Sequence, residues 1–137
     1  MRKAFTGLAA ALMLAIVVQF FLAASGAFDT ASTEEAFRPH RMLGLGTVLL
    51  AVLLTVAGAV ARLPGRLIGR AGLVAGLGVL QPVIVVVAKA FGDAGQSTTA
   101  GQLVFGLHAV NGLMMMAVVR TVLQESRAAT GSPRSVS

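Results

Sequence analysis

The sequence predicts an all-α protein, a four-span antiparallel transmembrane helix bundle. Hydrophobic residues make up 56% of the 137 residues and charged residues only 12%, and the mean hydropathy is +0.86. A bilayer core of about 30 Å needs roughly 17–25 apolar helical residues per span. Four runs without Asp, Glu, Lys or Arg fall within or at the edge of that range: 5–27, 42–61, 71–88 and 103–119. Short connections between the runs leave no room for a separate soluble domain.

The first run, 5–27, follows Arg2 and Lys3 and ends in the small residues Ser25, Gly26 and Ala27. This pattern is similar to a secretory signal with a cleavage site. The apolar core of a signal is only about 7–15 residues long, however, and this run is longer. We therefore expect a retained first span, whereas cleavage would leave three spans and an outer amino terminus.

The segment between the first and second runs predicts a short helix outside the membrane. Ser32 and Glu35 have the spacing of a capping box, in which the hydroxyl and the carboxylate satisfy backbone N–H groups at a helix start. Pro39 follows just before His40, where it can kink the entry of the second span or begin it. The second span, 42–61, then runs to a turn.

The remaining connections predict a tight turn, a polar loop and a tail. Pro64 and Gly65 interrupt the arginine-rich segment 62–70, and the glycine-rich segment 91–100 contains Ser and Thr residues that could cap the last helix. After Gln124 the composition becomes too polar to bury a core. We expect residues 1–126 to form the four-helix domain and residues 127–137 to form a disordered cytoplasmic tail.

The charges predict a cytoplasmic-membrane protein with both termini in the cytoplasm. With that orientation, eight of the eleven Lys and Arg residues lie inside, as the positive-inside rule requires. The basic residues cluster beside the spans and are not interleaved with aromatic residues, which argues against nucleic acid despite the net charge of +6. The chain has no cysteine, so metal chemistry would depend on histidine or carboxylate.

Small and polar residues recur on one face of the second and fourth spans. Residues three or four apart share a helix face. In lipid, small and polar residues prefer the interface between helices, and we expect both faces to point into the bundle. The two sets are His40, Gly44, Thr47, Ala51, Thr55 and Gly58, and then His108, Asn111, Gly112 and Met115.

Three amide side chains lie at membrane depth: Gln19 in the first span, Gln81 in the third and Asn111 on the inward face of the fourth. The simplest interpretation is that they make ordinary hydrogen bonds between helices, worth about 0.6 kcal/mol each on average. Gln81 precedes Pro82, which removes a backbone donor inside a helix, so Gln81 could supply local polar support. Both histidines are followed by a glycine four residues later, which allows a bundle of two similar halves.

The histidines are the candidate cofactor ligands, because an ionisable residue inside a membrane is more often functional. The alternative for His40, which lies near the interface, is a solvated boundary residue. Two inward imidazoles on the second and fourth spans can hold haem iron from both faces. In this hypothesis the site residues are His40 and His108 on the iron, Gln81 and Asn111 nearby, and Arg41 with the propionates. The sequence does not identify the cofactor, and haem b is the specific hypothesis, with a quinone as another flat candidate.

The placement of the histidines resembles one half of the haem A synthase four-helix bundle. In that family the second span starts with Glu-x-x-His-Arg and the fourth carries a second histidine. His40-Arg41 matches the end of the motif and His108 the second ligand, whereas Phe37 stands at the glutamate position. The chain is also similar to four-span bacterial membrane families of unknown function. Because no span carries an acid, catalysis by this chain alone is not expected.

The predicted depths of the two histidines in the membrane argue against both of them binding the same iron. Counted at 1.5 Å per residue from Arg62 and Arg120, His40 lies about 33 Å and His108 about 18 Å from the inner ends. An offset of about 15 Å is too large for two ligands of one iron unless the helices tilt, kink or extend. The alternative function is an accessory subunit without a cofactor, which packs beside a membrane-protein partner or a second copy of itself.

Overall fold

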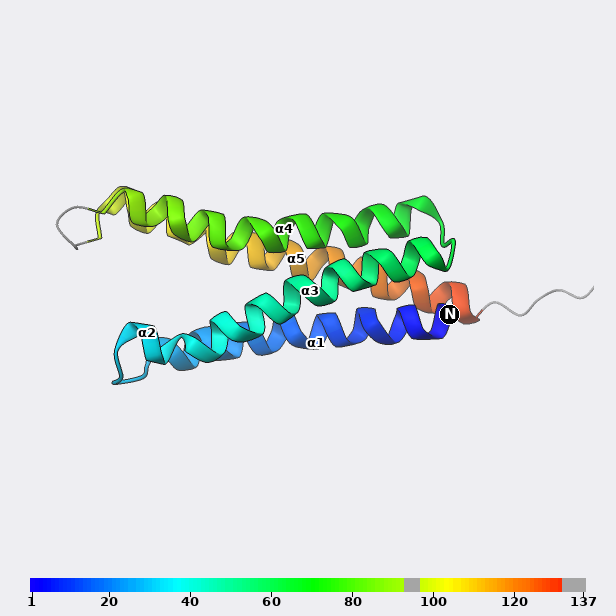
Figure 1. Cartoon of the computed structure of the whole chain (residues 1–137), viewed down its shortest axis with the longest axis horizontal. Helices are drawn as coiled ribbons and strands as arrows, with labels where there is room; N and C mark the ends of the chain where they lie inside the picture. The colour runs from blue at the N-terminus through cyan, green and yellow to red at the C-terminus, as the bar shows by residue number, and fades with distance from the viewer. Residues whose placement is uncertain (93–96, 132–137) are drawn as a thin grey trace, which may run out of the picture.

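The computed structural model describes residues 1–92 and 97–131, and within these ranges it contains helices and no strand (Figure 1). Four of the helices are long and apolar enough to cross a membrane, which confirms the predicted all-α, four-span fold class. The elements are α1 (Arg2–Ala27), α2 (Thr33–Ala36), α3 (Arg38–Val60), α4 (Gly65–Ala90) and α5 (Thr99–Gly131).

The four long helices form a ring in which each contacts its neighbours in the order α1, α3, α4, α5 and back to α1. Among the described residues, the diagonal pairs α1 with α4 and α3 with α5 make no close backbone contact. One end of the bundle holds the amino terminus, the α3–α4 turn and the described end of α5, and we call it the terminal end. The other, the loop end, holds α2 and the start of α5 (Figure 1).

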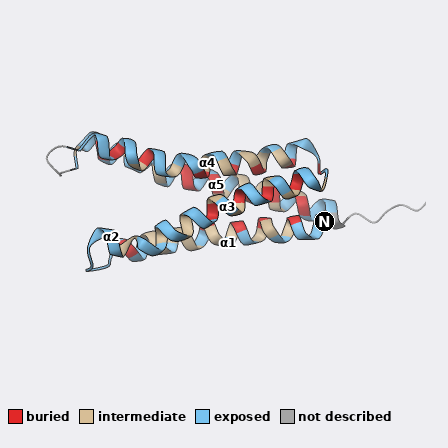
Figure 2. Ribbon diagram, viewed as in Figure 1, coloured by how far each residue is buried: buried red, intermediate tan, exposed pale blue. Residues whose placement is uncertain are grey.

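A continuous apolar core fills only the half of the bundle nearer the terminal end. Phe5 and Leu12 of α1 and Leu54 of α3 are among its fully buried side chains, each at most 1% exposed. The core ends near Ile16 and Ala51, about midway along the bundle. Buried residues in the loop half, such as Gly26 of α1 and Ala88 of α4, are few and lie outside that cluster (Figure 2).

Burial confirms the inward faces predicted for α3 and α5. Thr47 is 4% and Ala51 is 0% exposed, whereas Leu49 on another face of α3 is 60% exposed. On α5, Asn111 is 5% and Met115 is 4% exposed. The outward apolar side chains need no protein partner because hydrocarbon solvates them, and the bundle is that of a multi-pass membrane protein.

The helix boundaries differ from the apolar runs at both ends. Arg38 and Pro39 already belong to α3, because proline is well accommodated in the first turn, where no N–H partner is needed. The predicted outer helix is α2, whose Glu35 N–H is 3.4 Å from the Ser32 hydroxyl that accepts it. The tail prediction differs from the structure over residues 127–131, which continue α5; residues 132–137 lie outside the described residues.

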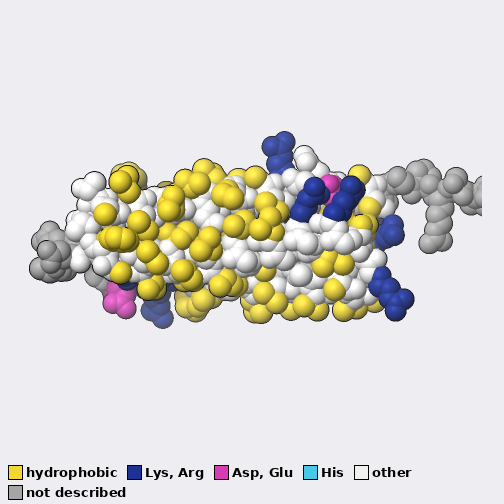
Figure 3. Space-filling model, turned by 90° about the horizontal axis from the view of Figure 1, so that it is seen from above, with side chains coloured by type: hydrophobic (Ala, Val, Ile, Leu, Met, Phe, Trp, Pro, Cys, Tyr) yellow, Lys and Arg dark blue, Asp and Glu magenta, His cyan; other side chains and the backbone are white. Residues whose placement is uncertain are grey.

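The longer α5 is explained by packing at the terminal end. Its Glu125 forms an ion pair with Arg70 of α4 and lies 3.5 Å from the Nε atom of Arg66. Ser126 is 4% exposed, and the alanines that follow it are strong helix formers. Figure 3 shows one acidic side chain among the basic ones near this end of the bundle. Contacts with α4 and with the α3–α4 turn therefore stabilise the additional turns of α5.

Helix α3 ends in a Schellman motif, and the residue in the left-handed conformation of this motif is an arginine instead of the usual glycine. The Leu63 N–H donates to the Gly58 carbonyl and the Arg62 N–H to the Ala59 carbonyl, each at 3.0 Å. Arg62 has a φ of 49°, in the left-handed region that glycine normally occupies in this motif. A side chain in this conformation costs roughly 1–2 kcal/mol.

Replacement of Arg62 by glycine should therefore stabilise the protein by about 1 kcal/mol, because glycine enters this region without steric cost. The measurement is equilibrium unfolding in detergent followed by helical circular dichroism. Arg62→Ala is the matched control, since it removes the charge but keeps the side-chain penalty. If Arg62→Gly and Arg62→Ala were equally stable, the stabilisation would not come from relief of the left-handed backbone conformation.

Candidate intramembrane histidine site

The loop half of the bundle brings the two histidines together across its diagonal. His40 lies in the first turn of α3 and His108 lies in α5. Their ring centroids are 6.1 Å apart with an interplanar angle of 52°. Since the backbones of α3 and α5 do not approach closely, only the side chains bridge this distance. Both imidazoles are partly buried.

The estimated depth offset of about 15 Å between the histidines was wrong. It was measured from Arg120, but α5 continues to Gly131. Counted from the helix ends at Val60 and Gly131, with a rise of 1.5 Å per residue, His40 and His108 lie at about 30 and 35 Å. The two residues therefore stand at nearly the same level of the bundle.

Each histidine is held by a main-chain carbonyl of a neighbouring helix. The Nδ1 atom of His40 is 3.0 Å from the Gln19 carbonyl oxygen of α1, and the Nδ1 atom of His108 is 3.3 Å from the Gln81 carbonyl oxygen of α4. A carbonyl oxygen only accepts, so both Nδ1 atoms carry a proton. In the neutral rings, Nε2 then keeps its lone pair and can bind a metal.

The glutamine side chains pack one helical turn below the histidines. A Cβ atom added to Gly44 would lie 2.9 Å from the Gln19 amide nitrogen, and one added to Gly112 would lie 3.4 Å from that of Gln81. The absence of a side chain at both glycines therefore lets a glutamine amide pack against the helix backbone. The side-chain oxygens of Gln19 and Gln81 are buried without a hydrogen-bond partner, which is unusual for buried polar atoms.

Asn111 completes this polar layer from α5. Its side-chain amide donates to the Leu77 carbonyl oxygen of α4 at 2.8 Å, and its own oxygen is buried without a partner. The Gln81 amide also lies 3.9 Å from the Met115 sulfur, a weak contact. Phe20 of α1 closes the layer from the side of the core, since its ring would be 3.1 Å from a Cβ atom at Gly112.

An aromatic side chain precedes each histidine by one turn. Phe105 stacks on His108 at a centroid distance of 5.5 Å and an interplanar angle of 5°. Phe37 meets His40 edge-on at 6.3 Å and 87°. Each imidazole therefore has an aromatic neighbour one turn before it on the same side of the chain.

Arg41 does not join the group around the histidines. Its guanidinium donates to the Glu34 carbonyl oxygen, and it lines a hollow of about 500 Å³ beside α2 together with Arg38 and Met42. A propionate could engage Arg41 only if the bond to Glu34 were released. Of the predicted site residues, the structure thus brings together His40, His108, Gln81 and Asn111.

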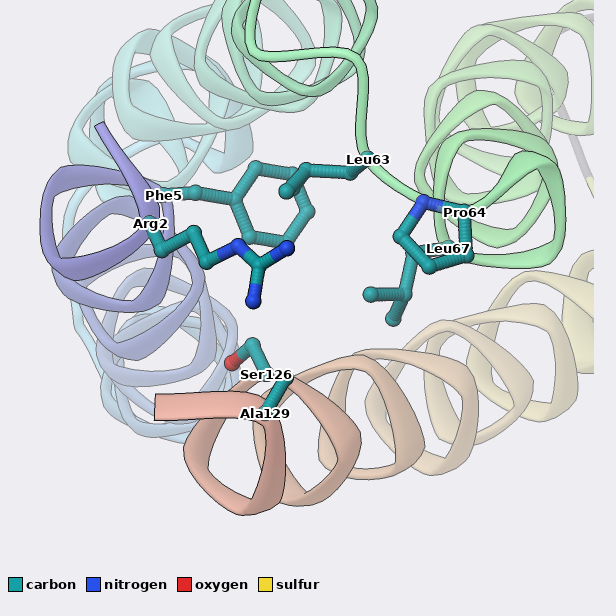
Figure 4. A pocket seen from close by; sticks show the side chains of 7 residues that line it. All are labelled: Arg2, Phe5, Leu63, Pro64, Leu67, Ser126 and Ala129. Carbon is teal, nitrogen blue, oxygen red and sulfur yellow. The ribbon is translucent and has the colours of Figure 1, made fainter. Parts of the chain in front are cut away.

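A second cavity, of about 60 Å³, lies at the opposite, terminal end. Phe5, Leu63 and Leu67 form apolar walls, and the Arg2 side chain extends across the cavity toward Ser126 (Figure 4). The Ser126 hydroxyl already donates to the Leu123 carbonyl oxygen at 2.9 Å. A cavity of this size has room for water, and it is separated from the histidines by the apolar core.

Two features of the site were not predicted from the sequence. Gln19 was expected only to make an ordinary hydrogen bond between helices, and the glycines after the histidines were recognised without the phenylalanines before them. The full pattern is Phe-x-x-His-x-x-x-Gly, which occurs once in 37–44 and once in 105–112. This repeat was visible in the sequence and is the signal that could have identified the surrounding residues.

The number and type of side chains that could bind a metal limit the chemistry of this site. Among the described residues, no group of three His, Asp or Glu side chains gathers to hold a bare metal ion. The site offers two imidazoles and several amide oxygens. Two nitrogen ligands on opposite sides suit a metal whose other positions are filled by its own macrocycle.

The fold and the histidine pair define a multi-pass membrane protein with a polar layer inside one half of its bundle. The chain belongs to a family of unknown function, DUF6220, whose model matches residues 19–89. That segment contains Gln19, His40 and Gln81, whereas His108 lies beyond it. No curated protein and no solved structure gave a significant match.

Cysteines placed at both His40 and His108 should be joined within one molecule by a short bifunctional thiol reagent, because the two side chains meet across the diagonal. The chain has no cysteine of its own, so the background is zero. The readout is the link between fragments after cleavage at a protease site inserted in the α3–α4 turn. Cysteines at the outward positions Leu45 and Leu107 are the control, and a link there but not at the histidines would contradict this geometry.

Proposed function

We propose that this protein binds a b-type haem between α3 and α5, with His40 and His108 as axial ligands, and that the chain itself is non-catalytic. The observation that carries the proposal is the separation and orientation of the two imidazoles. Bound haem supplies one-electron redox chemistry, and the protein contributes the ligands and an apolar surrounding.

The spacing of the rings supports this assignment. Metal–imidazole bonds of about 2.0–2.1 Å, with about 1.1 Å from each nitrogen to its ring centre, give a centroid separation of ~6.3 Å for two ligands on one metal. The observed separation is 6.1 Å. An angle of 52° between the ring planes is compatible, because each ring can rotate about its metal–nitrogen bond.

The hydrogen bonds to Nδ1 support it independently. Histidines that bind metals almost always donate their other ring N–H to a carboxylate, a backbone carbonyl or water. Both His40 and His108 donate to a backbone carbonyl. The bond fixes the tautomer that leaves Nε2 free and makes that nitrogen a stronger electron donor.

The interior of the loop half is less completely filled by apolar side chains, because the continuous apolar core stops before the level of the histidines. One turn below them, Gly44 and Gly112 are covered by the Gln19 and Gln81 amides, so a flat macrocycle would enter this half only with a movement of those amides. The resemblance to half of the haem A synthase bundle agrees with this proposal, but Phe37 replaces the glutamate of that motif, and we therefore propose binding without catalysis.

Purified wild-type protein, expressed with ample haem, should show a Soret band, and His108→Ala should abolish it, because the haem loses one of its two bonds to the protein and is no longer retained. His40→Ala should lower haem occupancy in the same way. Gln102→Ala, an exposed residue of α5 at the loop end, is the matched control and should keep the full spectrum.

A colourless wild-type protein would reject the haem proposal. In that case the accessory-subunit alternative predicts co-purification with a larger membrane complex, and His108→Ala would leave that association intact.

We further propose that the terminal end faces the cytoplasm of the cell and that the protein lies in the cytoplasmic membrane. Arg62, Arg66 and Arg70 lie at this end, and acidic Glu34 and Glu35 lie at the loop end. Basic residues in short loops are retained on the cytoplasmic side. The haem would then lie in the outer half of the bilayer.

Single cysteines test this orientation directly. In intact cells, a membrane-impermeant maleimide should label Ser32→Cys at the loop end, because that position would face outward. Gly65→Cys, in the α3–α4 turn, should react only after the membrane is opened. The reverse pattern would contradict the proposed orientation.

A further inference from the structure

The two hairpins of the bundle repeat the same set of contacts. The first hairpin pairs α1 with α3, and the second pairs α4 with α5. In each, the second helix carries a Phe-x-x-His-x-x-x-Gly segment, and the first helix carries the glutamine that accepts from the histidine Nδ1. The distance along the sequence from glutamine to histidine differs between the hairpins (21 and 27 residues). The two hairpins therefore match in their three-dimensional contacts and not in their sequence spacing.

Three kinds of contact and one unpartnered atom recur in both halves, although the phenylalanine is edge-on to His40 and stacked on His108. The Nδ1 to carbonyl distances are 3.0 and 3.3 Å. The glutamine amide lies against the glycine one turn below the histidine in both cases. A phenylalanine ring contacts each imidazole, and the oxygen of each glutamine side chain is buried without a partner.

We infer that the two hairpins are equivalent half-sites, and that Gln19 and Gln81 are matched positioning residues that hold His40 and His108 as a symmetric pair of ligands. The inference deepens the proposed function, on which its haem-dependent part rests. Two equivalent half-sites fit a ligand that presents the same chemistry on its two opposite faces. A one-sided ligand that needs one histidine as donor and the other as acceptor would not match two rings that both donate from Nδ1.

The physical basis is the register between the two helices of each hairpin. Because the Gln19 amide fits against Gly44, it fixes how far α1 slides along α3, and this places its own carbonyl oxygen opposite His40. Gln81 and Gly112 do the same for His108 in the second hairpin. Loss of the amide should therefore weaken the bond to Nδ1 although the carbonyl itself is still present.

The test compares Gln19→Met with Gln81→Met, since methionine keeps the length of glutamine but not its amide. The chain contains two histidines, so ¹⁵N-histidine NMR of the protein in lipid nanodiscs resolves both rings. Wild-type rings should both be protonated at Nδ1 and unprotonated at Nε2. Gln19→Met should shift the His40 signals and Gln81→Met the His108 signals by similar amounts, with no change in Gln102→Met.

In haem-loaded protein, both substitutions should raise the reduction potential to a similar extent. A weaker Nδ1 bond makes the imidazole a poorer donor, which stabilises ferric iron less. If either methionine variant does not fold, Gly44→Ala and Gly112→Ala displace the same amides and serve as the second pair.

A response in only one half, or in neither, would overturn the inference. The NMR readout needs no haem. If the wild type takes up no haem, the proposed function fails, while the two histidine tautomers and their response to the matched variants still decide whether the half-sites are equivalent.

Discussion

The structure of the loop half depends on two hydrogen bonds between an imidazole and a helical carbonyl. Hydrocarbon offers no water to satisfy a polar group, so an imidazole in a span needs a partner within the protein. His40 and His108 find it on the adjacent helices, at Gln19 and Gln81. Because these bonds use Nδ1, they decide which nitrogen each ring presents to the centre of the bundle.

The two halves of the bundle are packed differently. The terminal half is closed by buried apolar residues such as Phe5 and Leu54 and by the pairing of Glu125 with Arg70. Among the described residues, the loop half lacks this core and carries polar groups instead, three of them with buried oxygens that have no partner. The two halves of the bundle thus differ in whether apolar or polar side chains fill their interior.

The fold was predictable because lipid imposes strong length and composition rules. Four uncharged runs fixed the number of spans, and residue spacing identified inward positions such as Thr47 and Asn111, which are indeed buried. The end of α5 was not predictable in the same way. Arg120 marks the end of the apolar run, but tertiary contacts of Glu125 and Ser126 continue the helix to Gly131.

The site was predicted in part. Spacing placed His40 and His108 inside the bundle, yet their relative depth depended on the true helix end, and the direct count gave too large an offset. The partners of Nδ1 are main-chain atoms, which no side-chain pattern reveals. Arg41 was assigned from proximity in sequence, but a helix turns by about 100° per residue, and its side chain points toward Glu34.

The family match covers one histidine and both glutamines but does not reach α5, so the pairing of the two half-sites depends on the structure alone. Electron paramagnetic resonance of ferric, haem-reconstituted protein tests this pairing most directly. Two imidazoles on one iron predict a low-spin signal. A high-spin signal, or no bound haem to measure, would contradict the account.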